Sequence, residues 1–184
     1  ATLMDGSRIV MTLGREVSTK GSTFTIRRFR DEPFTPVDLL EFKTFSSMQI
    51  AFFWLAMQYG MSMLFVGGTA SGKTTSLNAC SLFLPWQHKI VSIEETRELN
   101  LPHPNWIPGC TRQGFGGESA GSGVKAAGEV DMYDLLRAAL RERPEYIIVG
   151  EIRGAEAYVL FQAMATGHTT YSTCLLYTSD AADE

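Results

Sequence analysis

The sequence predicts an α/β fold built on a mainly parallel sheet, and three observations lead to this prediction. Short apolar runs rich in β-branched residues alternate along the chain with longer helix-like segments. The glycine-rich stretch GGTASGKTT, residues 67–75, follows one such run and opens a helix. A chain of 184 residues, 45% of them hydrophobic, can also bury a substantial core. Strands separated by helices imply right-handed crossovers, so helices should cover both faces of the sheet.

The first 34 residues are polar and mixed, and glycines interrupt them repeatedly. Within them, residues 8–13 (RIVMTL) and 23–29 (TFTIRRF) alternate roughly as strands do. We expect residues 1–34 to be the end of an N-terminal α+β domain and the linker to the next domain.

Two helices are expected next. The first begins in EPFTPVD, with Thr35 as its N-cap and Pro36 in the first helical position. The second begins at Ser46 or Ser47 and ends at Gly60, because glycine is a natural C-cap. These helices open a second domain, which we expect to cover residues 35–173.

The rest of this domain alternates strands and helices. The expected elements are a strand at 61–66, a helix at 72–84, a strand at 89–95, a helix at 131–143, a strand at 146–151, a helix at 155–166 and a strand at 169–173. Between them, residues 109–128 hold seven glycines and predict a long loop. This loop could be a lid over a site or an ordinary surface loop.

The stretch GGTASGKTT matches the phosphate-binding pattern G-x-x-x-x-G-K-[ST] in the expected strand–loop–helix context. Glycines let backbone N–H groups turn inward around phosphate oxygens, and the helix N-terminus adds partial positive charge. Lys73 would reach the β- and γ-phosphates, and the Thr74 hydroxyl would hold Mg²⁺. The sequence therefore predicts ATP and Mg²⁺ as ligands, with the nucleotide bound by Gly67, Gly68, Thr69, Ala70, Ser71, Gly72, Lys73, Thr74 and Thr75.

Two expected strands end in carboxylates. YIIVGE ends at Glu151, and IVSIEETREL carries Glu94, Glu95 and Glu98. Ligands bind at the carboxyl ends of parallel strands, so both strand ends should lie beside the phosphates. We expect Glu151 to hold Mg²⁺, in part through water, and one of the other three acids to activate the attacking water.

Taken together, these stretches resemble the secretion ATPases that power type II and type IV secretion, type IV pili and the archaellum. GTASGKTT is similar to their Walker A motif, SIEETREL to their acidic box, and IIVGEIRGAEA to their atypical Walker B motif. TGHTTYST resembles the start of their histidine box. Order and spacing agree over roughly residues 5 to 173, and the wording is closest to the archaeal-type branch.

The resemblance implies a RecA-like P-loop NTPase core that hydrolyses ATP to ADP and phosphate. It assigns Lys73 and Thr74 to phosphate and Mg²⁺ binding. It makes Glu94 the catalytic glutamate of the acidic box, Glu151 the Walker B glutamate and His168 the first histidine of its box. It also places Arg27 and Arg28 where the family carries basic residues that can reach a neighbouring subunit's nucleotide, without saying which of the two would act.

The family assembles as homo-hexameric rings. It works at the cytoplasmic face of a membrane and pushes on a polytopic platform protein in that membrane. This sequence has no apolar run long enough to span a membrane, and a net charge of −4 with a pI near 5.4 gives no sign of direct nucleic-acid binding. We therefore expect a peripheral cytoplasmic motor subunit that drives protein secretion or filament assembly.

The end of the chain departs from the family. After GHTTYST the family continues with Met-His-Ala, whereas this chain reads CLLYTSDAADE. We expect residues 174–184 to be a foreign tail, the ATPase domain to be C-terminally truncated, and the chain to be a fragment. Whether such a fragment assembles or hydrolyses ATP cannot be deduced from it.

Three other functions stay open at this stage. A conjugation or DNA-uptake ATPase would be the same machine with another cargo. A P-loop phosphotransferase would need an arginine-rich lid, and the loop at 109–128 carries only Arg112 and Lys125 as basic residues. A regulatory nucleotide-binding module would need neither Glu94 nor Glu151. Which machine and which cargo are involved is not encoded in these motifs.

Overall fold

The computed structural model describes residue 3 and residues 7–16, 19–29, 32–112, 114, 127–152 and 157–176. Its internal contacts divide the chain into two compact units, Ala1–Glu32 and Pro33–Glu184. In the first unit, β1 (Arg8–Thr12) and β2 (Thr23–Arg27) form an antiparallel ladder in which Arg8 faces Arg27. The division falls two residues before the boundary expected from the sequence. That this unit belongs to a larger α+β domain stays a prediction.

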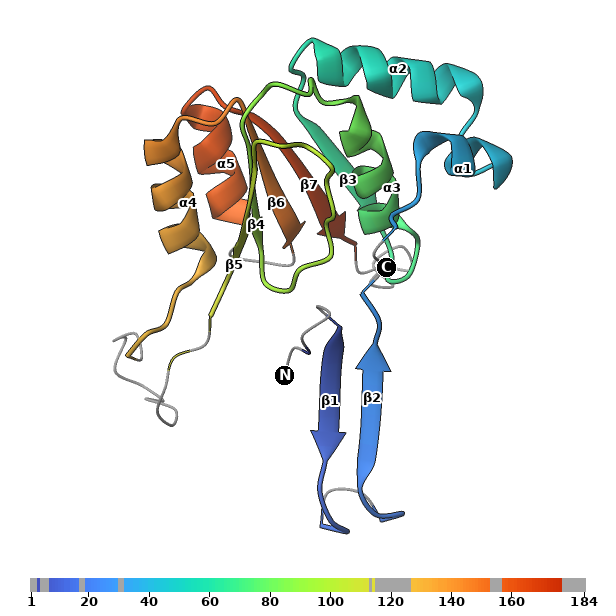
Figure 1. Ribbon diagram of the computed structural model, residues 1–184, viewed down its shortest axis with the longest axis vertical. Coiled ribbons are helices and arrows are strands. Elements are labelled where there is room, and N and C mark those ends of the chain that lie inside the picture. Colours follow the sequence, from blue (N-terminus) through green and yellow to red (C-terminus); the bar gives the residue numbers. More distant parts are fainter. Residues whose placement is uncertain are drawn as a thin grey trace, which may run out of the picture. The chain divides into compact units, whose positions relative to one another are not determined.

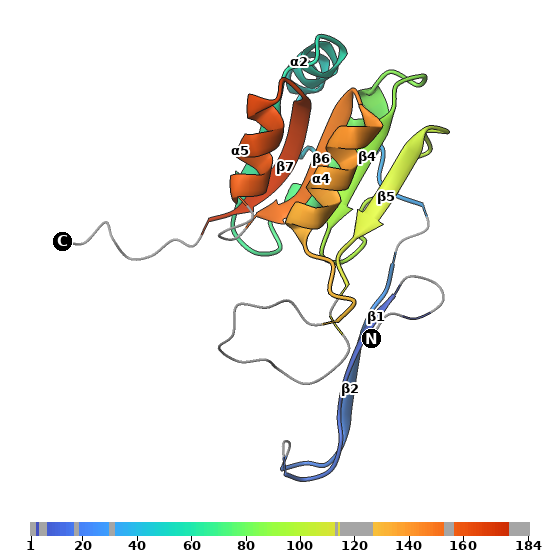
Figure 2. The same ribbon diagram turned by 90° about the vertical axis from the view of Figure 1, so that its left-hand side faces the viewer.

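The second unit is built on a five-stranded sheet, of which Figure 2 shows β7, β6, β4 and β5 side by side. All pairings in it are parallel, and the strand order is β3-β7-β6-β4-β5. The strands are β3 (Met63–Gly67), β4 (Ile90–Glu94), β5 (Trp106–Cys110), β6 (Tyr146–Ile152) and β7 (Thr169–Leu175). This arrangement confirms the predicted α/β fold with a parallel sheet.

Helices cover both faces of this sheet. In Figure 1, α4 and α5 lie on one face, and α3 lies with α1 and α2 on the other. The helices are α1 (Pro36–Glu41), α2 (Ser47–Gln58), α3 (Lys73–Cys80), the short 3₁₀ helix η1 (Ser81–Phe83), α4 (Met132–Glu142) and α5 (Ala157–Ala165). The N-caps Thr35, Ser46 and Asp131 each form a capping box with the residue three positions later.

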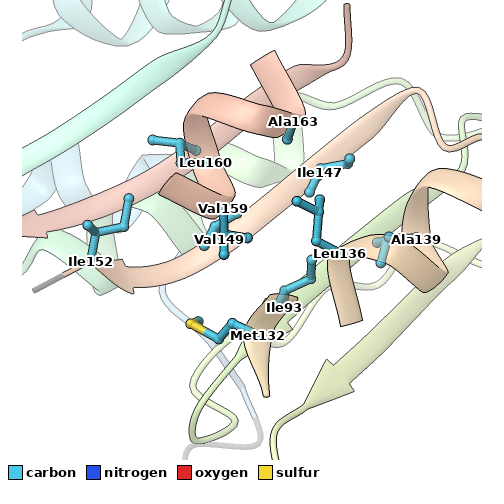
Figure 3. Close-up of a cluster of buried hydrophobic side chains, with 11 residues drawn as sticks. Ile93, Met132, Leu136, Ala139, Ile147, Val149, Ile152, Val159, Leu160 and Ala163 are labelled. Carbon is cyan, nitrogen blue, oxygen red and sulfur yellow. The ribbon is translucent and has the colours of Figure 1, made fainter. Parts of the chain in front are cut away.

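The central strand β6 is buried on both faces, as its uninterrupted apolar sequence predicts. Ile147 and Val149 pack under α4 and α5, in the cluster that Figure 3 shows. Tyr146 and Ile148 point to the opposite face and pack with residues of α2 and α3. Two cores therefore hold the sheet between its helices, and its strand ends are fixed relative to each other.

One strand was not predicted. Trp106–Cys110 forms β5 and pairs with β4, whereas the sequence placed Gly109 and Cys110 in the long loop. The sequence pattern did not predict this strand, because Pro108 and Gly109 are poor strand formers. Since β5 is an edge strand, a proline there removes no hydrogen bond that the sheet needs. Most of the remaining predicted loop, residues 113 and 115–126, lies outside the described residues.

The last strand runs beyond its expected end. β7 includes Cys174 and Leu175, which pair with Val66 and Gly67 of β3. Residues 177–184 of the expected tail lie outside the described residues, and the foreign origin of the tail stays a prediction. In the part of the chain that the structure describes, no helix is both long and apolar enough to cross a bilayer.

Candidate nucleotide-binding and catalytic site

The loop between β3 and α3 has the backbone of a phosphate cradle. A Cβ on Gly67 would lie 2.8 Å from Oγ of Ser71, so a larger residue at this position would force the Ser71 side chain to move. Gly72 has a φ of +85° and precedes α3, where it provides no side-chain cap. Because glycine has no side chain, Gly72 does not cap the N–H groups in the first turn of α3. An anion can bind to a helix N-terminus of this kind.

Lys73 lies at the start of α3 and is only 9% exposed. Its Nζ donates a hydrogen bond to the carbonyl oxygen of Gly68 at 2.7 Å and lies 3.9 Å from Oε1 of Glu151. The ammonium is therefore surrounded by oxygen atoms at the mouth of the loop. Phosphate oxygens could replace these partners without moving the lysine out of the site.

A β-bulge brings Glu151 to this position. The register between β6 and β7 shifts between Val149 and Glu151, and Oγ of Ser172 donates a hydrogen bond to the Gly150 carbonyl oxygen at 2.8 Å. Val149 and Ile152 both pack in the cluster under α4 and α5. Strict alternation would give these two residues opposite faces, so the extra residue in the bulge frees Glu151 to point toward Lys73 on the α3 side.

Glu94 ends β4 and is buried, with 2% of its surface exposed. Its Oε1 accepts hydrogen bonds from the backbone N–H groups of Glu98 and Leu99, at 3.0 and 3.1 Å. Its Oε2 is buried and finds no partner among the described residues. Burial raises the pKa of Glu94 to about 7, although the two N–H groups oppose this shift.

The neighbouring strand makes room for Glu94. A Cβ on Gly150 would lie 3.4 Å from Cα and Cγ of Glu94, so a larger side chain at position 150 would push against the acid. Of the three acids that the sequence offered, Glu95 is exposed and Glu98 is half-buried. Glu94 is the buried one among them, and its pKa near neutrality is what a general base needs.

Two residues that the sequence did not single out hold the segment after Glu94 in place. Asn78 of α3 accepts a hydrogen bond from the N–H of Asn100 at 3.2 Å. The indole N–H of Trp106 donates to Oγ of Ser92 at 3.1 Å, and the guanidinium of Arg97 lies 5.4 Å from the Trp106 ring centroid. Neither residue stands in a motif, so no local sequence pattern indicated this role.

The remaining predicted residues are placed as follows. Thr74 and Thr75 are half-buried in the first turn of α3, and their contacts to a metal or nucleotide stay predictions. His168 precedes β7, and its Nδ1 lies 3.0 Å from Oγ1 of Thr166. Thr173, the residue of β7 that pairs with Glu151, lies about 16 Å from His168 along the strand. The structure therefore does not bring His168 together with Lys73 and Glu151.

The positions of Leu175 and of the two arginines follow from the strands that carry or precede them. Leu175 stands at the position where the resemblance described above implies the second histidine of the histidine box. It pairs with Gly67, the first residue of the phosphate loop (residues 67–72). Arg27, the last residue of β2, and Arg28 are exposed in the first unit. Any role for these arginines at a nucleotide stays a prediction. Residues 153–156, within the stretch that resembles the Walker B motif, lie outside the described residues.

Comparison with known proteins finds similar sequences over most of the chain. A family model described as "Type II/IV secretion system protein" matches residues 7–184. An uncharacterised protein of Methanocaldococcus jannaschii is 50% identical over 172 residues, which are 94% of this chain and 30% of that protein. The type IV secretion system protein PtlH of Bordetella pertussis is 39% identical over 136 residues, 71% of this chain and 37% of PtlH.

Among solved structures, the VirB11 ATPase from the Brucella suis type IV secretion system superposes with a TM-score of 0.57. The sequence identity is 24%, and the match covers 98% of this chain and 58% of VirB11. At that identity the superposition establishes a shared fold. The chain spans about a third of the length of the two curated relatives described above.

Proposed function

The chain belongs to the family of type II/IV secretion system proteins, and from this premise we propose that it forms the nucleotide-binding core of an ATP-hydrolysing motor subunit. The observation that carries the proposal is the meeting of three groups at one end of the sheet. The Lys73 ammonium lies between the phosphate loop and the Glu151 carboxylate, while the buried Glu94 ends the strand beside Gly150. A binding module without turnover would need neither acid.

The residues present suit ATP and Mg²⁺. A side chain at position 67 would press on Ser71 of the loop, and Lys73 already holds two oxygen partners that phosphate oxygens could replace. The hydroxyl of Thr74 and the carboxylate of Glu151 are the oxygen ligands that Mg²⁺ prefers, in part through water. When bound, the metal neutralises charge on the phosphates. Lys73 and the loop N–H groups orient the terminal phosphate for attack.

Glu94 is then the residue that accepts the proton of the attacking water. Its Oε1 is held by two backbone N–H groups, which leaves Oε2 to face a reactant. A pKa near 7 keeps a large fraction of the carboxyl ionised at neutral pH and still basic enough to take a proton. One carboxylate cannot bind the metal and accept the proton of the water equally well. We therefore assign the metal to Glu151 and the proton to Glu94.

The proposed machine is a secretion system, a type IV pilus or an archaellum-like filament. In it, the subunit would form a homo-hexamer at the cytoplasmic face of a membrane and push on a polytopic platform protein. Support for this assembly comes from the family and from the resemblance of the four motifs. A conjugation ATPase is the alternative with the same chemistry, and a different cargo would distinguish it.

The proposal is tested by nucleotide binding and turnover of the natural protein that carries this sequence. Lys73→Ala should weaken ATP binding at least about 100-fold, because it removes the charge that faces the phosphates. Glu151→Gln should still bind ATP but lose turnover, since the amide keeps the shape and loses the charge.

Lys89→Ala serves as the control for the lysine variant. Lys89 lies at the opposite end of β4 from Glu94 and pairs with Glu142 at 3.5 Å, so its loss should leave ATP binding unchanged. Unchanged ATP affinity in Lys73→Ala would contradict the nucleotide site. Full turnover in Glu151→Gln would show that Glu151 has no catalytic role.

A further inference from the structure

Thr173 lies on β7. This strand runs between β3, which leads into the phosphate loop, and β6, which carries Glu151. Thr173 pairs with Phe65 on one side and with Glu151 on the other. Tyr171, two residues earlier on the same strand, packs in the cluster with Leu77 of α3. Because side chains alternate along a strand, Thr173 also projects to the α3 face, where Lys73 and Glu151 meet.

The hydroxyl of Thr173 is buried without a partner. The residue is 1% exposed, and its Oγ1 makes no hydrogen bond within the described chain. The hydroxyl of Tyr171 on the same strand is also buried without a partner among the described residues, whereas Thr169 donates to the Gly60 carbonyl oxygen at 2.9 Å and Ser172 donates to that of Gly150. A buried hydroxyl that lacks a partner destabilises the fold, so a valine of the same shape would serve the packing better.

We propose that the Thr173 hydroxyl donates a hydrogen bond to the terminal phosphate of a bound nucleoside triphosphate and thereby distinguishes it from the diphosphate. The inference rests on the proposed function, because it requires a triphosphate in the loop. Lys73 approaches that phosphate from the β3 side and Glu151 from the β6 side, and β7 runs between them.

The chemistry of the group fits this role. A threonine hydroxyl cannot act as a general base near neutral pH, but it donates readily to a charged phosphate oxygen. Glu151 lies on the neighbouring strand β6 and Glu94 on β4, the strand beyond it, and both carboxylates would be repelled by the same oxygens. A neutral donor on β7 therefore adds recognition of the phosphate without adding another negative charge.

The test compares Thr173→Val, which removes the hydroxyl and keeps the shape, with Thr173→Ser, which keeps the hydroxyl. In the natural protein, Thr173→Val should lose about 10- to 100-fold in affinity for a non-hydrolysable ATP analogue, as for a hydrogen bond to a charged group. Its affinity for ADP should not change. Turnover should fall by a similar factor, and Thr173→Ser should stay within about threefold of the wild type.

Thermal unfolding without nucleotide separates recognition from structure. Thr173→Val should unfold at the wild-type temperature or higher, because it removes an unpaired buried hydroxyl. Thr170→Val is the control on the same strand, since Thr170 is equally buried and its hydroxyl contacts Ser62 at 3.4 Å. This control should leave the preference for the triphosphate unchanged.

Two results would overturn the inference while leaving the proposed function intact. One is a Thr173→Val protein that binds the ATP analogue and turns over like the wild type. The other is an equal loss for ATP analogue and ADP together with a lower unfolding temperature, which would make Thr173 a packing residue. A wild-type protein that binds no ATP would overturn both this inference and the function on which it rests.

Discussion

Glu94 is held between two opposing effects. Its burial favours the protonated carboxyl, whereas the N–H groups of Glu98 and Leu99 favour the carboxylate. Burial is the larger effect and raises the pKa to about 7. The nearby charges of Glu98 and Arg97 act in opposite directions and change this balance less. The residue therefore changes its charge within the physiological pH range.

This pKa predicts how activity depends on pH. If Glu94 is the general base, turnover should rise as pH increases from about 6 to 8, with a midpoint near 7, because only the ionised form accepts a proton. Glu94→Gln should lower turnover by about 100-fold or more, while Glu95→Gln should have a smaller effect. The measurement is the pH–rate profile of ATP hydrolysis. A wild-type profile that is flat from pH 6 to 8 would argue against this role.

The same shift predicts stability with the opposite sign. The folded protein holds the Glu94 proton up to pH 7, whereas the unfolded chain releases it near pH 4.5. The free energy of unfolding contributed by this group should thus be full below pH 4.5 and fall as pH rises to 7, by about 3 kcal/mol at most. Glu94→Gln should remove this loss, so at pH 8 the variant should be more stable than the wild type in denaturant titrations.

At the scale of elements, the sequence predicted what is periodic and missed what is irregular. The strands and helices from Pro36 to Leu175 follow apolar runs and caps, so all but one could be located. β5 was missed because Pro108 and Gly109 interrupt its pattern, and an edge position tolerates both. The bulge at Gly150 was invisible for another reason: it depends on the register with β7, which no local pattern encodes.

The site likewise contains residues that local motifs predicted and residues that they did not. The phosphate loop and the two acids could be identified because each follows a strand in a recognisable motif. Thr173 and Asn78 could not, because their importance lies in contacts across the sheet: one hydroxyl without a partner, and one amide that accepts from a distant segment. Such contacts depend on the tertiary arrangement, and neither residue type is unusual in its local sequence.

Helix α3 and the segment after β4 should be coupled through Asn78. Removing its side chain in Asn78→Ala leaves the N–H of Asn100 without its acceptor and loosens the residues that position Glu94. We expect turnover to fall about three- to tenfold, equivalent to roughly 1 kcal/mol, with ATP affinity unchanged. The measurement is steady-state hydrolysis together with equilibrium nucleotide binding.

Ser81→Ala provides the matched control for this coupling. Ser81 is buried just after the same helix, and its hydroxyl donates to the Leu77 carbonyl oxygen at 2.7 Å without touching the segment after β4. Both variants should lose about 1 kcal/mol of unfolding free energy, but only Asn78→Ala should lose turnover. Equal turnover in the two variants would show that Asn78 only stabilises the fold.

Considered as a whole, the chain consists of a two-stranded unit and a sheet unit, and the groups proposed for catalysis, Lys73, Glu94 and Glu151, belong to the second. The sheet unit supplies Lys73 and two acids to the proposed site. Hydrolysis of a triphosphate builds charge on the terminal phosphate, and an arginine from outside the core commonly stabilises it, with effects of about 10³ to 10⁵ in rate. Arg27 and Arg28 of the first unit are the proposed source.

Subunit mixing tests whether one of these arginines acts on the nucleotide of a neighbouring subunit. Neighbours along an extended chain point to opposite faces, so we expect Arg27→Ala and Arg28→Ala to differ, with only one of them strongly lowering turnover. Mixing that variant with Lys73→Ala, each inactive alone, should restore hydrolysis. The Lys73→Ala subunit then supplies the arginine, and its neighbour supplies the intact phosphate loop. Mixed assemblies confirmed by mass but without activity would contradict action between subunits, and normal turnover in both arginine variants would exclude these residues from catalysis.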